Sequence, residues 1–184
     1  MADNASQLSR VAATLQKLNL LVGNVVAWLT VAMVLVVSVI VIDRYWFASG
    51  SIRVQESVSF MHAAVFMLAA AWTLARGGHV RVDIFYSSMS PRGKAIVDIT
   101  GTLLLLVPFC LFLIWTSWDY VATSWAIGES SLETGGLPFP FPAIMKSFIP
   151  LSAGLLLLQG IVMILFAIAT LISPATSTAA GKNA

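Results

Sequence analysis

The sequence predicts an all-α integral membrane protein with four transmembrane helices. Hydrophobic residues make up 59% of the 184 residues and charged residues 10%, whereas soluble globular proteins carry about 25% charged residues. Four apolar segments, at about 18–42, 58–75, 99–118 and 148–172, contain no Asp, Glu, Lys or Arg. Each is close to the roughly 20 residues that cross a hydrocarbon core of about 30 Å. We expect residues 18–172 to form one membrane domain.

The first apolar segment, 18–42, is too long for a secretory signal peptide, and it is followed by Asp43 and Arg44 instead of a small-residue cleavage site. We therefore expect a retained first membrane helix. Residues 1–17 are polar but carry an apolar stripe at helical spacing, formed by Leu8, Val11, Leu15 and Leu18. Two interpretations stay open for this cytoplasmic segment: a short amphipathic helix on the membrane surface, or a frayed extension of the first membrane helix.

Small and weakly polar residues predict close packing between helices, because they let two backbones approach each other. On the first helix they lie roughly on one side, at Gly23, Asn24, Ala27, Thr30 and Ser38. On the second they are Ser59, Ala63, Ala64, Ala70, Ala71 and Ala75.

Both ends of the second helix carry a signal. Glu56 stands at its start, where a carboxylate is favourable beside the unpaired backbone N–H groups of the first turn. We favour this capping role over a specific contact with a partner. The helix should end at Arg76-Gly77-Gly78-His79, because glycine readily adopts the left-handed conformation that terminates helices.

Prolines predict irregular structure in the second half of the chain. Pro108 should kink the third helix, because it removes a backbone hydrogen bond and crowds the preceding turn. Residues 135–142, with three prolines at alternate positions, cannot form regular helix. Pro150 is expected in the first turn of the fourth helix. Residues 173–184 are expected to be a disordered cytoplasmic tail.

The distribution of basic residues predicts the orientation in the membrane. Seven lie near the termini or in the central loop: Arg10, Lys17, Arg76, Arg81, Arg92, Lys94 and Lys182. The other three, Arg44, Arg53 and Lys146, belong to the two outer loops. Lys and Arg close to membrane segments are retained on the cytoplasmic side. We therefore expect both termini and the central loop in the cytoplasm.

The composition argues against several functions. A net charge of +2 disfavours nucleic acid as a partner, and the single Cys110 supplies neither a disulfide framework nor a cysteine metal site. His62 and His79 lie 17 residues apart, about 25 Å along a helix, so they cannot ligate one haem together. An ion-coupled transporter usually has ionisable groups inside the membrane, whereas the four predicted spans contain no Asp, Glu, Lys or Arg. We therefore expect no enzymatic activity and no cofactor, and instead a membrane scaffold or accessory subunit.

Two segments carry a more specific signal. The first is Glu56, the alanine-rich helix after it, and the stretch Arg76-Gly77-Gly78-His79-Val80-Arg81-Val82-Asp83. The second is the outer loop with Trp118, Tyr120, Trp125, Gly128-Glu129-Ser130-Ser131, the run from Pro138 to Pro142, Lys146 and Ile149-Pro150. Together they resemble the small, DctQ-type permease subunit of tripartite ATP-independent periplasmic (TRAP) transporters. The resemblance covers about residues 18–172.

The resemblance implies a multi-pass protein of the bacterial cytoplasmic (inner) membrane with two protein partners. One is a large multi-helix permease subunit that carries the substrate and sodium sites. The other is a soluble periplasmic solute-binding protein that delivers an organic acid or related solute. The small subunit would brace the stationary part of the large one, and membrane lipid would surround both.

Two sets of contact residues follow as hypotheses. The candidates for the interface with the large subunit are Glu56, Arg76, His79, Arg81 and Asp83. The candidates on the outer loop, which faces the binding protein, are Trp125, Glu129, Ser130 and Glu133. A solvated loop that packs on the large subunit explains the second set at least as well. For Arg92 and Lys94 we favour simple topology and contact with lipid headgroups.

Three alternatives remain at this point. A small homodimeric four-helix exporter would need a carboxylate inside the membrane, which the predicted spans lack. A membrane anchor for a redox enzyme would most simply use two histidines at similar depth. The third alternative is a structural membrane protein unrelated to transport.

Overall fold

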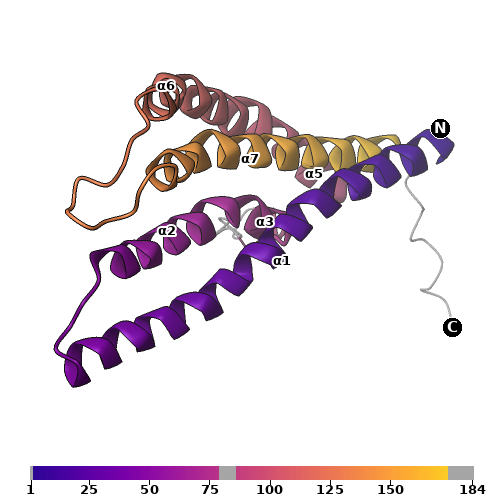
Figure 1. Cartoon of the computed structure of the whole chain (residues 1–184). Coiled ribbons are helices and arrows are strands. Elements are labelled where there is room, and N and C mark those ends of the chain that lie inside the picture. The colour runs from indigo at the N-terminus through magenta and orange to yellow at the C-terminus, as the bar shows by residue number, and fades with distance from the viewer. Residues whose placement is uncertain (1, 79–85, 174–184) are drawn as a thin grey trace, which may run out of the picture.

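The computed structural model describes residues 2–78 and 86–173, and within these ranges the regular structure is entirely helical (Figure 1). The helices are α1 (Ala2–Trp46), α2 (Ile52–Leu68), α3 (Ala70–Ala75), α5 (Pro91–Gly101), the π-helix η1 (Thr102–Leu106), α6 (Val107–Ala126) and α7 (Phe141–Ile172). Four helical stretches are long and apolar enough to cross a membrane: Asn4–Trp46, Ile52–Ala75, Pro91–Ala126 and Phe141–Ile172. The predicted all-α fold with four membrane helices is confirmed.

Helix α1 runs without interruption from Ala2 to Trp46. Its N-terminal half packs against the rest of the chain, because Ala12 and Asn19 are buried. The Nε2 atom of Gln16 also donates a hydrogen bond of 3.3 Å to the carbonyl of Ala75. Residues 2–17 therefore continue the first membrane helix as a packed extension that is not frayed, and they do not form a separate surface helix.

The second span differs from the prediction at its start. Helix α2 begins at Ile52 after the cap residue Ser51, so Glu56 lies in its second turn. The expected capping role of Glu56 is therefore wrong, because the unpaired N–H groups of the helix start lie one turn earlier.

The end of the second span follows the prediction. The N–H of Gly77 donates to Leu74 O and that of Gly78 to Thr73 O, with Gly77 in the left-handed region at a φ of 67°. This pair of bonds is the Schellman motif that satisfies the last carbonyls of a helix. The two glycines thus end α3 as expected. His79 and the rest of 79–85, including Arg81 and Asp83, lie outside the described residues.

The third span contains a π-helical turn just before Pro108, and the kink expected at Pro108 itself stays a prediction. Helix α5 begins at Pro91 with Ser90 as its cap, whose Oγ accepts a hydrogen bond of 3.2 Å from the Gly93 N–H. The N–H of Val107 then donates to Thr102 O, five residues back. This π-helical turn lies directly before Pro108, which has no N–H to donate, and such turns are recognised sites of helix distortion.

The fourth span begins earlier than predicted. Helix α7 starts at Phe141, with Pro142 near its beginning, and Pro150 lies inside the helix. The placement of Pro150 in the first turn is therefore wrong. The apolar pattern missed these turns because it stops at charged residues such as Lys146, although helices continue through charged residues near the membrane interface. The predicted tail after Ser173 lies outside the described residues.

Helix α7 is the centre of the arrangement, since it contacts α1, α2, α3, α5 and α6. In Figure 1 the N-terminal half of α1, α3, α5 and the C-terminal end of α7 gather at one end, which we call the inner end. The hairpins α1–α2 and α6–α7 diverge toward the other, outer end, where their connecting loops lie. Small side chains dominate the buried set, among them Ala64, Ala71, Ala143, Ala153 and Ala167.

Candidate functional site

The outer loop, residues 127–140, connects α6 to α7 and contacts α2 through Glu56. The Glu56 carboxylate accepts a hydrogen bond from the Ser131 hydroxyl and another, at 2.6 Å, from the backbone N–H of Leu137. Within the loop, the Ser131 N–H donates to Leu137 O at 2.9 Å. Both oxygens of Glu56 are thus used to hold the loop against α2. Hydrogen bonds to a charged acceptor are about twice as strong as neutral ones.

A glycine is required where the loop meets Glu56. A Cβ atom added to Gly136 would lie 2.5 Å from Ser131 Oγ and 2.7 Å from Glu56 Oε2. Real Cβ atoms do not approach other heavy atoms this closely, so any larger residue would displace the loop or the carboxylate. Arg53, one turn before Glu56 on α2, adds a hydrogen bond of 3.3 Å from Nε to the Gly136 carbonyl.

A second contact holds the beginning of the loop to α7. The Lys146 ammonium forms an ion pair with Glu129 and lies 4.0 Å from the ring centroid of Tyr120. The hydrogen bond from Lys146 keeps the pKa of Glu129 below its usual value. Tyr120 comes from α6 and Lys146 from α7, so the cation links the two helices as well as the loop.

Aromatic and hydroxyl groups complete the loop. The indole N–H of Trp125 donates a hydrogen bond of 3.0 Å to the Ser147 hydroxyl, and its ring packs edge to face on Phe139 with centroids 5.7 Å apart. Ser130 Oγ accepts a bond of 3.2 Å from the Phe139 N–H. Edge-to-face ring pairs stabilise beyond the area they bury. These contacts fix the conformation of residues 125–139.

The structure therefore brings together four of the predicted contact residues, Glu56, Trp125, Glu129 and Ser130, in one intramolecular network. Glu133 points outward beside the fully exposed Leu132, at the tip of the loop. Arg76 lies at the inner end, with its guanidinium 4.4 Å from the centroid of the Trp72 ring.

A second polar cluster lies inside the membrane domain and joins α1 to α7. The Asn19 Nδ2 atom donates to Gln159 Oε1 at 3.0 Å and to the Leu155 carbonyl at 3.3 Å. Both side chains are almost fully buried. Neutral amides suit this depth because they pair without the large desolvation cost of a charge.

One turn further along α1, the helix meets α3. Asn24 Oδ1 accepts a hydrogen bond of 3.1 Å from the Trp72 indole N–H. The Trp72 side chain lies so close to Gly23 that a Cβ there would come within 2.2 Å of Cγ. The small residues predicted to allow close helix packing therefore include one position, Gly23, at which only glycine fits.

Several members of these clusters were not predicted to have these roles. The sequence pattern uses Arg53 and Lys146 only for the orientation in the membrane and the resemblance, and it gives no partner for Asn19, Tyr120, Ser131 or Gly136. No local pattern connects Glu56 to Ser131, 75 residues away in the chain. The available signal was the two pairs of turn-forming residues in this Pro-rich loop, Ser130-Ser131 and Gly135-Gly136, because serine and glycine favour tight turns.

The hydrogen bonds and the ion pair that hold residues 127–140, which we call the outer network, serve to fix the outer loop in position. The carboxylates of the outer network accept hydrogen bonds from within the chain, and the described residues contain no group of three or more His, Cys, Asp or Glu that could hold a metal ion. The network presents a fixed loop surface at the outer end.

Comparison with protein families gives the identity of this arrangement. The family model described as Tripartite ATP-independent periplasmic transporters, DctQ component, matches residues 9–170, which is most of the chain. The search of curated protein sequences found no match to this chain. Proteins of this family are multi-pass subunits of the inner membrane and work with a large permease subunit and a periplasmic binding protein. The chain belongs to the DctQ family and is the small membrane subunit of a TRAP transporter.

Proposed function

We propose that this subunit braces the large permease subunit while the complex takes up an organic acid or related solute, driven by an ion gradient and dependent on a binding protein. The observation that carries the proposal is the outer half of α1, which packs against α2 on one side and is exposed on its other sides. Trp28, Leu35 and Tyr45 are 73%, 63% and 83% exposed. A membrane helix exposed over so much of its length is available to contact a partner's helices.

Small residues on this part of α1 favour a protein partner over lipid alone. Ala27, Thr30 and Ser38 are exposed and lie on one side of the helix. Such residues let another helix approach closely, and close packing is what drives association between helices in a membrane. We therefore propose that this side of α1 contacts the large subunit.

The solute and ion sites are assigned to the large subunit. Support comes from the interior of this chain, where the buried amides Asn19 and Gln159 bond to each other. The charged side chains Glu56 and Lys146 lie near the outer end, tied to the loop. A bracing role needs a stable shape and no binding site of its own.

The remaining contact residues stay part of the proposal. Arg76, His79, Arg81 and Asp83 would meet the large subunit on the inner side. At the outer end, Glu56, Trp125, Glu129 and Ser130 would act by fixing the loop. Leu132 and Glu133, at the exposed tip, would then be the residues that meet the binding protein.

The test replaces an exposed small residue on α1. In the assembled transporter, Thr30→Trp should lower co-purification of the large subunit and reduce the maximal uptake rate several-fold. The apparent KM for the solute should stay unchanged, because the solute site is not touched.

Val25→Trp is the matched control. Val25 is 61% exposed but lies about 140° around the helix from Thr30, so its replacement should leave both readouts near the wild-type values. Wild-type yield and uptake for Thr30→Trp would exclude this side of α1 from the interface. A rise in KM alone would point to a direct role in solute binding.

A further inference from the structure

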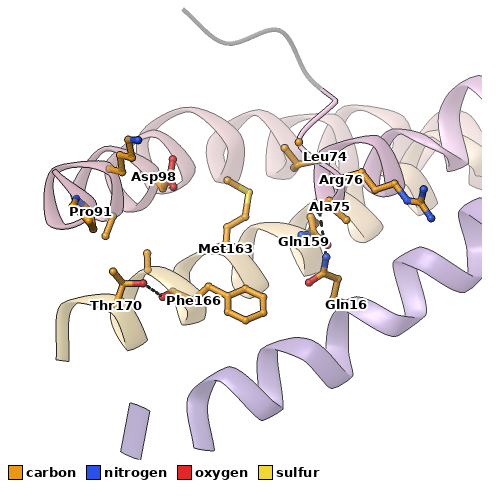
Figure 2. Close-up of a pocket in the computed structure, with 14 residues that line it drawn as sticks. Gln16, Leu74, Ala75, Arg76, Pro91, Asp98, Gln159, Met163, Phe166 and Thr170 are labelled. Carbon is orange, nitrogen blue, oxygen red and sulfur yellow. Dashed lines mark hydrogen bonds between the residues drawn. The ribbon is translucent and has the colours of Figure 1, made fainter. Parts of the chain in front are cut away.

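A cavity of about 620 Å³ opens at the inner end, between α1, α3, α5 and α7 (Figure 2). Gln16 of α1 and Leu74 of α3 line one side, and Lys94 and Asp98 of α5 line another. Figure 2 shows Met163 and Phe166 of α7 beside this space, and the Arg76 side chain directed away from it. The volume lies within the range of about 300–1,000 Å³ typical of ligand sites.

The α7 wall gives the cavity its depth. Gln159, Met163, Phe166 and Thr170 line it at helical spacing, and the eleven helical steps from Gln159 to Thr170 span about 16 Å. Thr170 lies near the end of α7 and Gln159 well inside the membrane domain. The cavity therefore runs from the headgroup level into the apolar region, with Met163 and Phe166 between its two ends.

The charges in the cavity come as a pair of opposite sign. Lys94 and Asp98 lie one turn apart on α5, and both line the space. Asp98 Oδ2 accepts a hydrogen bond of 2.9 Å from the Tyr86 hydroxyl, and a carboxylate has the capacity for further donors. The Arg76 guanidinium packs on the Trp72 ring, and the Lys94 ammonium lies 5.4 Å from the centroid of the Tyr86 ring, whose hydroxyl bonds to Asp98. Lys94 is therefore the cation of the described cavity wall that lies close to Asp98.

We propose that this cavity binds a phospholipid with a zwitterionic headgroup that ends in a primary ammonium, as in phosphatidylethanolamine. The phosphate would pair with Lys94, the ammonium with Asp98, and an acyl chain would lie over Met163 and Phe166. Basic pockets between membrane helices on the cytoplasmic side bind lipid headgroups. The Asp98 carboxylate, one helical turn from Lys94, disfavours a purely anionic headgroup and favours a headgroup that carries both a negative and a positive charge.

The experiment measures the lipids that remain bound. The transporter complex is purified from native membranes in mild detergent, and each phospholipid class is quantified by mass spectrometry per complex. The wild type should retain about one phosphatidylethanolamine at this site. Asp98→Asn should lower the retained phosphatidylethanolamine at least threefold and raise phosphatidylglycerol, because Lys94 then acts alone. Lys94→Gln should lower both.

Two further variants separate the cavity from the surface around it. Arg92→Gln removes an exposed cation of the same helix that does not line the cavity, and it should leave the retained lipid unchanged. Thr170→Trp narrows the mouth of the cavity at an exposed position. It should reduce the amount of phosphatidylethanolamine retained per complex without loss of the large subunit.

Three results would overturn the proposal. One is the same lipid content in the wild type and in the Asp98, Lys94 and Thr170 variants. Another is retention of mainly anionic lipid by the wild type. The third is loss of the large subunit from the Thr170→Trp complex with unchanged lipid, which would show that the partner occupies the cavity. The lipid readout does not depend on uptake, so it stands apart from the test of bracing.

Discussion

The outer loop and the buried seam between α1 and the helices α3 and α7 hold the molecule together by different means. The loop is fixed by the charged groups Glu56, Glu129 and Lys146. The seam uses the neutral amides Asn19 and Gln159 and a glycine that lies against a tryptophan ring. Ionised side chains are tolerated at the membrane interface, where water and headgroups reach them, but cost several kcal/mol in the hydrocarbon. Depth in the membrane thus decides which chemistry joins two segments.

The comparison predicts that a change of side-chain size in the seam has the largest effect on stability. Gly23→Ala should lower the free energy of unfolding by about 1–3 kcal/mol, the usual cost of overpacking, because the new Cβ would lie 2.2 Å from Trp72 Cγ. Thermal unfolding of the purified complex in detergent measures this effect. At Gly154, nothing lies within 4 Å of an added Cβ, so Gly154→Ala is the control and should change stability by less than about 1 kcal/mol. Equal melting temperatures for the two variants would contradict the close packing of α1 on α3.

The amide pair should contribute less than the glycine contact. Asn19→Leu or Gln159→Leu should each cost about 0.6–1.7 kcal/mol, the range measured for hydrogen bonds between membrane helices. Asn19 Oδ1 has no partner within the described structure, which limits the net gain from this pair. The double variant should lose less than the sum of the two single losses, because each single change leaves one amide unpaired. Strict additivity in the same unfolding assay would show that the two side chains act independently.

The outer network should affect the loop more than the whole fold. Glu56→Gln removes the negative charge that strengthens the hydrogen bonds from Ser131 and Leu137, because bonds to a charged acceptor are about twice as strong as neutral ones. Limited proteolysis within residues 127–140 should become several-fold faster, with little change in the melting temperature. Glu133→Gln alters an exposed carboxylate of the same loop and serves as the control. If both variants are cut at the wild-type rate, Glu56 does not hold the loop.

Much of the fold could be predicted because each signal for it is local. Apolar length identified four spans, and Arg76-Gly77-Gly78 identified the end of α3. The errors fell at helix ends. Glu56 was placed at the start of α2 and Pro150 at the start of α7, because an apolar pattern stops at the first charge while the backbone hydrogen bonds of the helix continue.

The candidate site was predictable as a set of residue types but not as an arrangement. The motif around Glu129 and Ser130 indicated an outer loop of the family now shown by the match over residues 9–170. It did not indicate that Glu129 pairs with Lys146. Four of the side chains expected to face a partner, Glu56, Trp125, Glu129 and Ser130, are bonded within the chain. Another, Glu133, is exposed beside Leu132 at the tip of the loop.

The sequence by itself determined the number of membrane helices, the class of the protein and its family, because hydrophobic length and short motifs need no knowledge of distant neighbours. Only the tertiary structure decided which polar groups meet: Glu56 with the outer loop, Asn19 with Gln159, and Lys94 and Asp98 around one cavity. The reason is physical. A helix places its own residues by a fixed repeat, whereas contacts between helices depend on how each rotates and tilts against α7, and that is set by the packing of all of them together.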